Sequence, residues 1–347
     1  MIKRILYTLL IMFPVVASAQ INTDRVMAIG RNALYFEDYV LSIQYFNQVI
    51  NAKPYLSDPY FYRGLAKINL DDFQGAESDC SEAIERNPFV VSAYQVRGLA
   101  RIQQNNFAGA IEDYTKALEF DPENIGVWHN MALCRIRQED YKGAKNDLDK
   151  LIAISPRYTK AYLMRGEVDL KQKDTLAAEK DFGKAIEIDR YDADTWASRA
   201  ILRLQQQRYK DAEADFDHAI RLSTRNSGVY INRALARYHQ NNLRGAMSDY
   251  DIALDIDPNN FIGHYNRGLL RAQVGDDNRA IQDFNFVIEM EPDNMMAIFN
   301  RGLLLDQTGD YKGAIKDYST VINEYPNFLQ GNQYRAQARR KIEDVKG

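Results

Sequence analysis

Cysteine is almost absent from this sequence, with only Cys80 and Cys134 in 347 residues. Both stand at positions where small, buried residues are expected, and they lie far apart along the chain. We therefore expect two buried thiols and exclude a disulfide bond between them, even in a compartment that would permit one.

Histidine is equally scarce, and the short motifs of catalysis are missing. The chain has no Gly-rich phosphate loop, no nucleophile elbow and no Cys/His pair at a catalytic spacing. No two histidines lie three or four residues apart, the spacing that would place two metal ligands on one helix face. The sequence therefore predicts no metal, no cofactor and no enzyme, the remote alternative being an enzyme whose site is assembled across repeated segments. The four histidines are His129, His218, His239 and His264.

Positive charge is not in excess either. Lysine and arginine number 44 against 48 acidic residues, which leaves a net charge of −4. This balance excludes the global basic field typical of proteins that bind nucleic acids. Hydrophobic residues make up 46% of the chain, too many for a disordered protein, so we expect a folded one.

Long hydrophobic runs are missing except at the N-terminus. Residues 3–4 are basic, residues 5–16 are apolar, and residues 17–19 read Ala-Ser-Ala. This order of basic, apolar and small residues is typical of a secretory signal peptide. The apolar run is shorter than the ~20 residues that a membrane span needs.

The N-terminal pattern predicts a signal peptide over residues 1–19, cleaved near Ala19 and Gln20. The alternative is an uncleaved anchor. We expect the mature chain to lack a transmembrane segment and to be exported, to the periplasm if the source is a Gram-negative bacterium. No cysteine adjoins the cleavage site, so no lipid attachment is expected there.

What the sequence does contain is an internal repeat with a period of 34 residues. Small residues form one column at this spacing: Gly30, Gly64, Gly98, Ala132, Gly166, Ala200, Ala234, Gly268, Gly302 and Ala336. Bulkier, mostly aromatic residues form another: Phe46, Cys80, Tyr114, Leu148, Phe182, Phe216, Tyr250, Phe284 and Tyr318. Prolines form a third, interrupted by Arg190 and Thr224: Pro54, Pro88, Pro122, Pro156, Pro258, Pro292 and Pro326.

These columns predict a helix, a short turn and a second helix in each repeat, with the proline ending the second helix. Small residues let the two helix axes approach closely, and the aromatic side chain fills the space beside them. One hairpin of this size cannot bury its own apolar stripe. Stability must therefore come from neighbouring hairpins stacked on one another.

The columns resemble the tetratricopeptide repeat, whose 34-residue period carries a large aromatic residue, a Gly or Ala, further Ala positions and a closing Pro in this order. The opening aromatic residues are Tyr60, Tyr94, Trp128, Tyr162, Trp196 and Tyr230, followed by His264 and Ile298. The resemblance implies an all-α fold, a right-handed α-solenoid superhelix of about nine helix-turn-helix repeats.

By this phasing the repeat array spans residues 20–328 and ends in a capping helix over residues 329–347. The repeats run over 23–56, 57–90, 91–124, 125–158, 159–192, 193–226, 227–260, 261–294 and 295–328. The last helix is basic, which suits an anionic partner, but we favour a polar end cap because cations near a helix C-terminus also complement its dipole. Its cations are Arg335, Arg339, Arg340 and Lys341.

An arginine and an aspartate recur 16 residues apart in nearly every repeat. The arginines are Arg63, Arg97, Arg165, Arg199, Arg233, Arg267, Arg301 and Arg335, and the aspartates are Asp79, Asp113, Asp147, Asp181, Asp215, Asp249, Asp283 and Asp317. An antiparallel hairpin brings both positions to similar heights, so bidentate pairing is plausible within a repeat or to the next repeat. We favour pairing within a repeat and a structural role, in which case Asp181→Ala destabilises the array.

The resemblance also implies that the first helices line a concave face that binds partners. On these helices, Tyr238, His239, Tyr265, Met296 and Phe299 depart from the aliphatic row of the other repeats. Rings and a thioether suit apolar side chains of an extended or helical peptide. We predict that these five residues gather into the principal contact. The pattern with which chaperone-binding repeats hold a terminal carboxylate is not found.

The sequence thus predicts a non-catalytic scaffold or adaptor that binds a protein or peptide in an exported compartment. A carbohydrate or cell-wall binding module is the alternative, because the 22 tyrosines offer stacking surfaces. Neither the partner nor the oligomeric state follows from the sequence.

Overall fold

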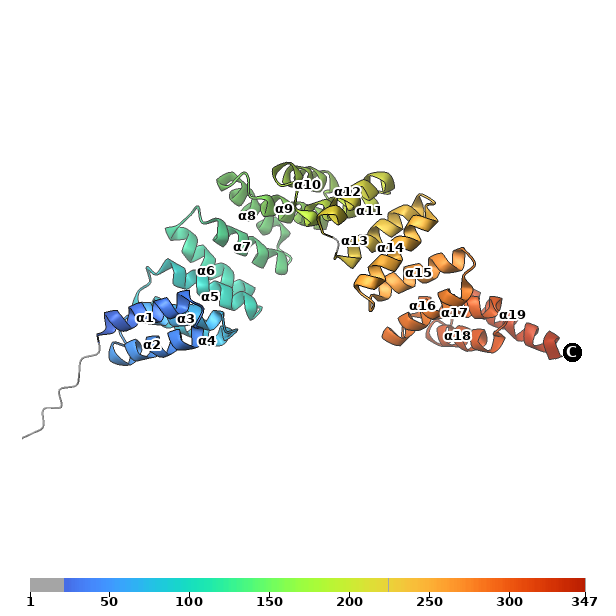
Figure 1. The fold of residues 1–347 in the computed structure, drawn as a ribbon, viewed down its shortest axis with the longest axis horizontal. Helices are drawn as coiled ribbons and strands as arrows, with labels where there is room; N and C mark the ends of the chain where they lie inside the picture. The colour runs from blue at the N-terminus through green and yellow to red at the C-terminus, as the bar shows by residue number, and fades with distance from the viewer. Residues whose placement is uncertain (1–21, 224, 347) are drawn as a thin grey trace, which may run out of the picture. The chain divides into compact units, whose positions relative to one another are not determined.

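The computed structural model describes residues 22–223 and 225–346 (Figure 1). The predicted signal peptide lies outside these residues. All regular elements in the described part of the chain are α-helices. They are α1 (Thr23–Tyr35), α2 (Tyr39–Ala52), α3 (Asp58–Ile68), α4 (Phe73–Arg86), α5 (Val91–Gln103), α6 (Phe107–Phe120), α7 (Ile125–Arg137), α8 (Tyr141–Ile154), α9 (Thr159–Lys171), α10 (Thr175–Ile188), α11 (Ala193–Gln205), α12 (Tyr209–Leu222), α13 (Ser227–His239), α14 (Leu243–Ile256), α15 (Phe261–Gln273), α16 (Asp277–Met290), α17 (Met295–Gln307), α18 (Tyr311–Glu324) and α19 (Leu329–Lys346).

The chain divides into two compact units, one up to Pro156 and the other from Arg157. The first holds α1–α8 and the second α9–α19. Within each unit, every helix packs against the helix before it and the helix after it. The predicted all-α fold of stacked helical hairpins is confirmed. No helix in the described ranges is long and apolar enough to cross a membrane.

Side-chain caps begin most of the second helices. The capping oxygen accepts a hydrogen bond from the third backbone N–H of the helix, which would otherwise lack a partner. The caps are Asp38, Asp72, Asn106, Asp140, Asp174, Asn242 and Asp310. The sequence therefore marks the start of these helices with a short polar residue.

A left-handed residue reverses the chain between the two helices of each hairpin. This residue has a positive φ of 58–93° in all nine turns among the described residues. Only the last two of these residues are glycines, although a side chain disfavours this backbone region. They are Glu37, Asp71, Asn105, Glu139, Lys173, Gln207, Asn241, Gly275 and Gly309.

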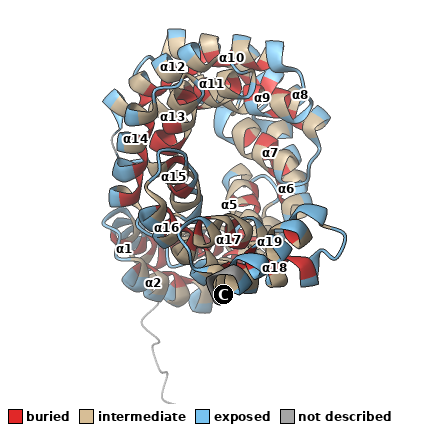
Figure 2. Ribbon diagram, turned by 90° about the vertical axis from the view of Figure 1, so that its right-hand side faces the viewer, coloured by how far each residue is buried: buried red, intermediate tan, exposed pale blue. Residues whose placement is uncertain are grey.

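The predicted small and aromatic columns meet in the core of each hairpin. A Cβ atom on Gly166 would lie only 2.6 Å from the ring of Phe182, so the small residue is required by the ring opposite it. Figure 2 shows buried residues recurring along the helices between exposed ones. The side chains of the aromatic column that are at most 2% exposed are Phe46, Cys80, Tyr114, Leu148, Phe182, Phe216, Tyr250, Phe284 and Tyr318.

Both cysteines are buried and free, as predicted. Burial raises the pKa of the Cys80 thiol to about 12 and that of the Cys134 thiol to about 11. Because the thiolate is the reactive form, little of either group is reactive at neutral pH.

The arginine and aspartate columns pair within repeats. In the hairpin of α11 and α12, Arg199 donates from Nε and Nη2 to the two carboxylate oxygens of Asp215, each at 2.8 Å. The same bidentate contact joins Arg63 to Asp79, Arg233 to Asp249 and Arg301 to Asp317. These aspartates are buried, so each pair fixes the height of one helix against the other.

The third nitrogen of the arginine reaches back to the preceding repeat. Arg233 Nη1 donates to Asp217 at 2.7 Å and Arg267 Nη1 donates to Asp251 at 2.9 Å. Arg301 makes the same contact with Asn285 at 2.8 Å. One guanidinium therefore joins two helices of its own hairpin to the hairpin before it.

A second cation shares the aspartate in most hairpins, a feature that the two-column prediction missed. We call the arginine that pairs within its repeat the ladder arginine. The residue four positions after it supplies the second cation. The contacts are Lys67 with Asp79 at 2.9 Å, Arg101 with Asp113 at 3.0 Å, Arg203 with Asp215 at 2.8 Å, Arg237 with Asp249 at 2.9 Å and Arg271 with Asp283 at 2.7 Å.

Asp147 is the exception in this row of carboxylates. Met131 stands where the other hairpins place the first arginine, and Arg135 alone approaches the carboxylate, at 2.8 Å. Burial raises the pKa of Asp147 to about 6 although Arg135 opposes the shift. The charged form of Asp147 is therefore held at a cost.

Candidate interaction surfaces

The predicted residues Tyr238 and His239 lie together at the end of α13. Their rings meet edge to face with 5.5 Å between centroids. His239 is exposed and stacks on Tyr209 of α12, with 4.6 Å between centroids and 9° between planes. Tyr238 packs on the core that contains Tyr250. The tyrosine therefore supports the hairpin, while the histidine faces solvent.

Tyr265, another predicted contact residue, is tied into the packing of α15. It is half-buried and meets Phe284 edge to face, with 5.8 Å between centroids. Its hydroxyl accepts a hydrogen bond from Asn300 Nδ2 at 3.1 Å, which links α15 to α17. Burial raises the pKa of Tyr265, and the bond from Asn300 opposes the rise.

Met296 and Phe299, the last two predicted residues, line a single hollow of about 740 Å³ near the end of the array. We call it the C-terminal groove. Its lining residues are Asp293, Asn294, Met295, Met296, Phe299, Val321, Glu324, Tyr325, Pro326, Asn327 and Phe328. The structure thus brings two of the five predicted residues together here and places the other three on α13 and α15.

The two predicted residues in the C-terminal groove differ in role. Phe299 packs against the rings of Tyr318, Phe328 and Tyr334 and is half-buried. Met296 is 63% exposed, and Tyr325, which lines the same groove from the turn after α18, is 55% exposed. Sequence reasoning missed Tyr325 because it lies in the turn beside the proline column, outside the first helices.

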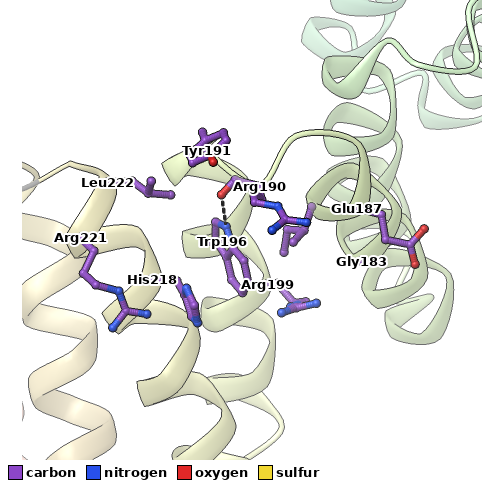
Figure 3. A pocket seen from close by; sticks show the side chains of 10 residues that line it. Gly183, Glu187, Arg190, Tyr191, Trp196, Arg199, His218, Arg221 and Leu222 are labelled. Carbon is purple, nitrogen blue, oxygen red and sulfur yellow. Dashed lines mark hydrogen bonds between the residues drawn. The ribbon is translucent and has the colours of Figure 1, made fainter.

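A second hollow, of about 600 Å³, lies within the unit that starts at Arg157, and the sequence did not predict it. We call it the Trp196 pocket (Figure 3). The end of α10, the following turn, α11 and the end of α12 form it. Its lining residues are Gly183, Ile186, Glu187, Arg190, Tyr191, Trp196, Arg199, His218, Arg221 and Leu222.

Aromatic stacking builds the centre of the Trp196 pocket. The rings of Trp196 and His218 stack with 4.2 Å between centroids and 13° between planes. Trp196 Nε1 donates to the backbone carbonyl of Arg190 at 3.0 Å, which fixes the indole against the turn. Figure 3 shows Arg190 and Arg199 next to the indole and Arg221 beyond the imidazole.

No group of three or more His, Cys, Asp or Glu side chains suited to a metal ion occurs among the residues that the structure describes. The hollows are lined by rings, thioethers, guanidinium groups and a few carboxylates. Such surfaces suit the recognition of side chains by contact and charge.

Family models match most of the repeated part of the chain. A TPR repeat model matches residues 98–134, and two tetratricopeptide repeat models match residues 125–158 and 159–192, and residues 198–261 and 265–327. Together these segments cover more than half of the 347 residues. The chain belongs to the tetratricopeptide repeat family.

Solved tetratricopeptide repeat structures share this fold at low sequence identity. A tetratricopeptide repeat protein from Parabacteroides merdae is 21% identical, with a TM-score of 0.55, over 72% of this chain and 98% of that one. The C-terminal part of a TPR repeat-containing protein from Cytophaga hutchinsonii is 17% identical, with a TM-score of 0.57, over 68% of this chain and 97% of that one.

PilF from Pseudomonas aeruginosa is 19% identical, with a TM-score of 0.53, over 62% of this chain and 97% of that one. At these identities the similarity shows the fold alone. No curated protein matches the chain.

Proposed function

We propose that this tetratricopeptide repeat protein is a non-catalytic scaffold that binds an extended segment of a partner protein in the C-terminal groove. The exposure of Met296 and Tyr325, which line the same hollow from α17 and from the turn after α18, carries the proposal. Both side chains lose water when an apolar side chain enters between them, and burial of apolar surface is the main source of affinity in such contacts.

The charges around the groove narrow the class of partner. Asp293 and Glu324 are exposed carboxylates among its lining residues, and no lysine or arginine lines it. We expect the bound segment to carry an apolar anchor next to a lysine or arginine, because opposite charges at the rim favour encounter and set the register.

A double substitution on the exposed walls tests the proposal. Met296→Ser with Tyr325→Ser removes apolar contacts without opening the core. Leu176→Ser is the matched control, because Leu176 is 81% exposed and lies on α10, away from the groove. Phe299 and Tyr265 suit this test less well, because both also pack between helices.

The measurement starts with affinity capture from the native envelope fraction and identification of the partner. Binding of that partner to purified wild-type and variant chains is then measured by calorimetry. We expect the double variant to bind at least tenfold more weakly and the control to bind normally. Equal binding by both variants would refute the groove, and capture of peptidoglycan or sugars instead would favour the carbohydrate-binding alternative.

We further propose that the mature chain works in an exported compartment, where a scaffold of this kind serves envelope assembly, transport or secretion. The order of basic, apolar and small residues over 1–19 supports this. Cell fractionation with N-terminal sequencing tests it. We expect a mature chain that starts near Gln20, and a full-length cytoplasmic chain would contradict the proposal.

A further inference from the structure

The Trp196 pocket departs from the repeat pattern at two of the positions that line it. Arg190 replaces a proline of the closing column, and Gly183 replaces a polar residue. At the position of Gly183, every other repeat has a polar side chain. These are Asn47, Ser81, Thr115, Asp149, Asp217, Asp251, Asn285 and Ser319.

Because Gly183 has no side chain, it offers no hydrogen-bond acceptor to Nη1 of Arg199. In most other repeats this polar side chain accepts from Nη1 of the ladder arginine, as Asp217 does from Arg233 at 2.7 Å. A Cβ atom on Gly183 would lie 4.0 Å from Arg199 Nη1, so the glycine stands where the acceptor would begin. Nε and Nη2 of Arg199 bind Asp215, and Nη1 has no hydrogen-bond partner among the described residues.

Arg190 adds a second cation without disturbing the turn. Its carbonyl accepts from Trp196 Nε1 at 3.0 Å, just as the carbonyl of Pro122 accepts from Trp128 at 2.8 Å in a turn that keeps the proline. The backbone therefore keeps the geometry of the proline turns, and only the side chain changes. The exchange replaces a rigid ring with an exposed guanidinium.

Arg221 supplies a third guanidinium from the end of α12. Neither Arg190 nor Arg221 forms an ion pair with any described residue. Glu187 is the only carboxylate that lines the pocket, and Lys184 already pairs with it at 2.9 Å. The pocket is thus a site of net positive charge around a stacked aromatic surface.

We propose that the Trp196 pocket is a second binding site, which takes an acidic side chain next to an aromatic one from a partner protein. The carboxylate lies among Arg190, Arg199 and Arg221, with Arg199 Nη1 as donor. The neighbouring ring lies against Trp196 and His218, beside Tyr191, which is 76% exposed. A volume of about 600 Å³ holds two such side chains.

This inference rests on the proposed function only in that the ligand is a segment of a protein. The C-terminal groove carries carboxylates and the Trp196 pocket carries guanidinium groups, so the two sites select segments of opposite charge. Loss of one site leaves the other intact, and separate assays can therefore refute each.

The chain has two tryptophans, and this makes a direct test available. Trp128 and Trp196 occupy the same column, and each indole N–H donates to the carbonyl of the preceding turn. In an NMR spectrum of the ¹⁵N-labelled chain, the indole signal of Trp196 reports on the pocket, and that of Trp128 is an internal reference from a turn that keeps its proline.

The probes are three short peptides that alternate Phe with Glu, with Gln or with phosphoserine. We expect the Glu peptide to shift the Trp196 signal saturably, the Gln peptide to bind at least tenfold more weakly, and the Trp128 signal to stay in place. Equal shifts with Glu and Gln peptides, or equal shifts of both indoles, would overturn the proposal. Binding of the phosphoserine peptide alone would overturn it in favour of a phosphate site.

Gly183→Asp is the decisive variant, because it restores the acceptor that other repeats have and occupies Arg199 Nη1. We expect it to fold, since Asp217 and Asp251 hold the same position, and to weaken the Glu peptide about tenfold. Arg221→Gln should weaken that peptide as well. Unchanged affinity in both variants would show that the guanidinium groups do not hold the carboxylate.

Discussion

At the scale of single residues, the buried carboxylates of the hairpins differ in how fully they are neutralised. Asp249 is buried and pairs with two cations, Arg233 and Arg237. Asp147 has Arg135 alone, and its pKa is raised to about 6 from an ordinary 3.8. Folding therefore favours the protonated form of Asp147.

The sign of the resulting pH dependence follows from this raised pKa. The stability that Asp147 contributes is fully present below about pH 3.8 and is lost as the pH rises through about 6. We expect Asp147→Asn to raise the free energy of unfolding by about 1 kcal/mol at pH 8 and to have no effect at pH 3, where the carboxyl is protonated in both the folded and the unfolded chain. Asp249→Asn is the matched control and should destabilise by about 3 kcal/mol at pH 8.

Denaturant unfolding followed by circular dichroism measures both changes, with hydrogen exchange in α7–α8 and α13–α14 to locate them. A loss of stability in Asp147→Asn at pH 8 would show that Arg135 satisfies the carboxylate.

The pairing of arginine with aspartate within each repeat could be predicted from the sequence. A 16-residue offset places the two residues opposite each other in any antiparallel hairpin of this length. The sharing of one aspartate by two cations could not be predicted in the same way. Arginine is common on exposed helix faces, so nothing in the sequence marks Arg101 and Arg237 as partners of a buried carboxylate. A column of polar residues broken only at Gly183 was a usable signal for the Trp196 pocket, but the role of that column is visible only once Arg233 is seen to reach Asp217.

At the scale of secondary-structure elements, the turn inside each hairpin is set by one left-handed residue. Gly309 has a φ of +93°, and a Cβ atom added there would touch nothing within 4 Å. Gly309→Ala therefore isolates the backbone cost, and we expect a loss of about 1 kcal/mol in the free energy of unfolding. The change is read from the denaturant midpoint.

Gly183→Ala is the matched control for this turn, because Gly183 lies inside α10 and its nearest neighbour would be 4.0 Å from the new Cβ. An alanine there should stabilise by about 0.5–1 kcal/mol through helix propensity. If both alanines shift the midpoint in the same direction, the left-handed turn is not a constraint on stability.

The helices themselves were predictable because small, aromatic and proline columns recur in one phase. The C-terminal groove was predictable only in part. Met296 is free to meet a ligand, whereas Tyr265 bonds to Asn300 and Phe299 packs on three rings. Sequence spacing predicts which helix face a ring lies on. Whether neighbouring side chains then cover that ring depends on how the next hairpin packs.

At the scale of the whole molecule, each hairpin depends on its neighbours for burial, and the last hairpin depends on α19. Tyr334 of α19 stacks on Tyr318 and meets Phe299, and Ala338 is fully buried. Removal of residues 329–347 would expose these surfaces to water. We expect faster hydrogen exchange throughout α17–α18 in the truncated chain and no change in α9–α12.

Replacement of the basic residues on the same helix separates capping from recognition. The combined variant Arg339→Gln with Arg340→Gln keeps the packing residues and should leave exchange in α17–α18 unchanged. Exchange as fast as in the truncated chain would mean that charge, and not burial, stabilises the end of the array.

The contact between a ladder arginine and the preceding hairpin affects how such chains can gain or lose repeats. A 34-residue segment brings its own arginine and aspartate, and it also brings a polar residue that serves whichever arginine comes next. Duplication or deletion of a whole segment that carries all three residues, as residues 227–260 do with Arg233, Asp249 and Asp251, therefore leaves neither an unpaired buried charge nor a donor without its acceptor. Gain or loss of such whole segments keeps every ion pair complete, whereas a duplication that ends inside a hairpin separates an arginine from its aspartate.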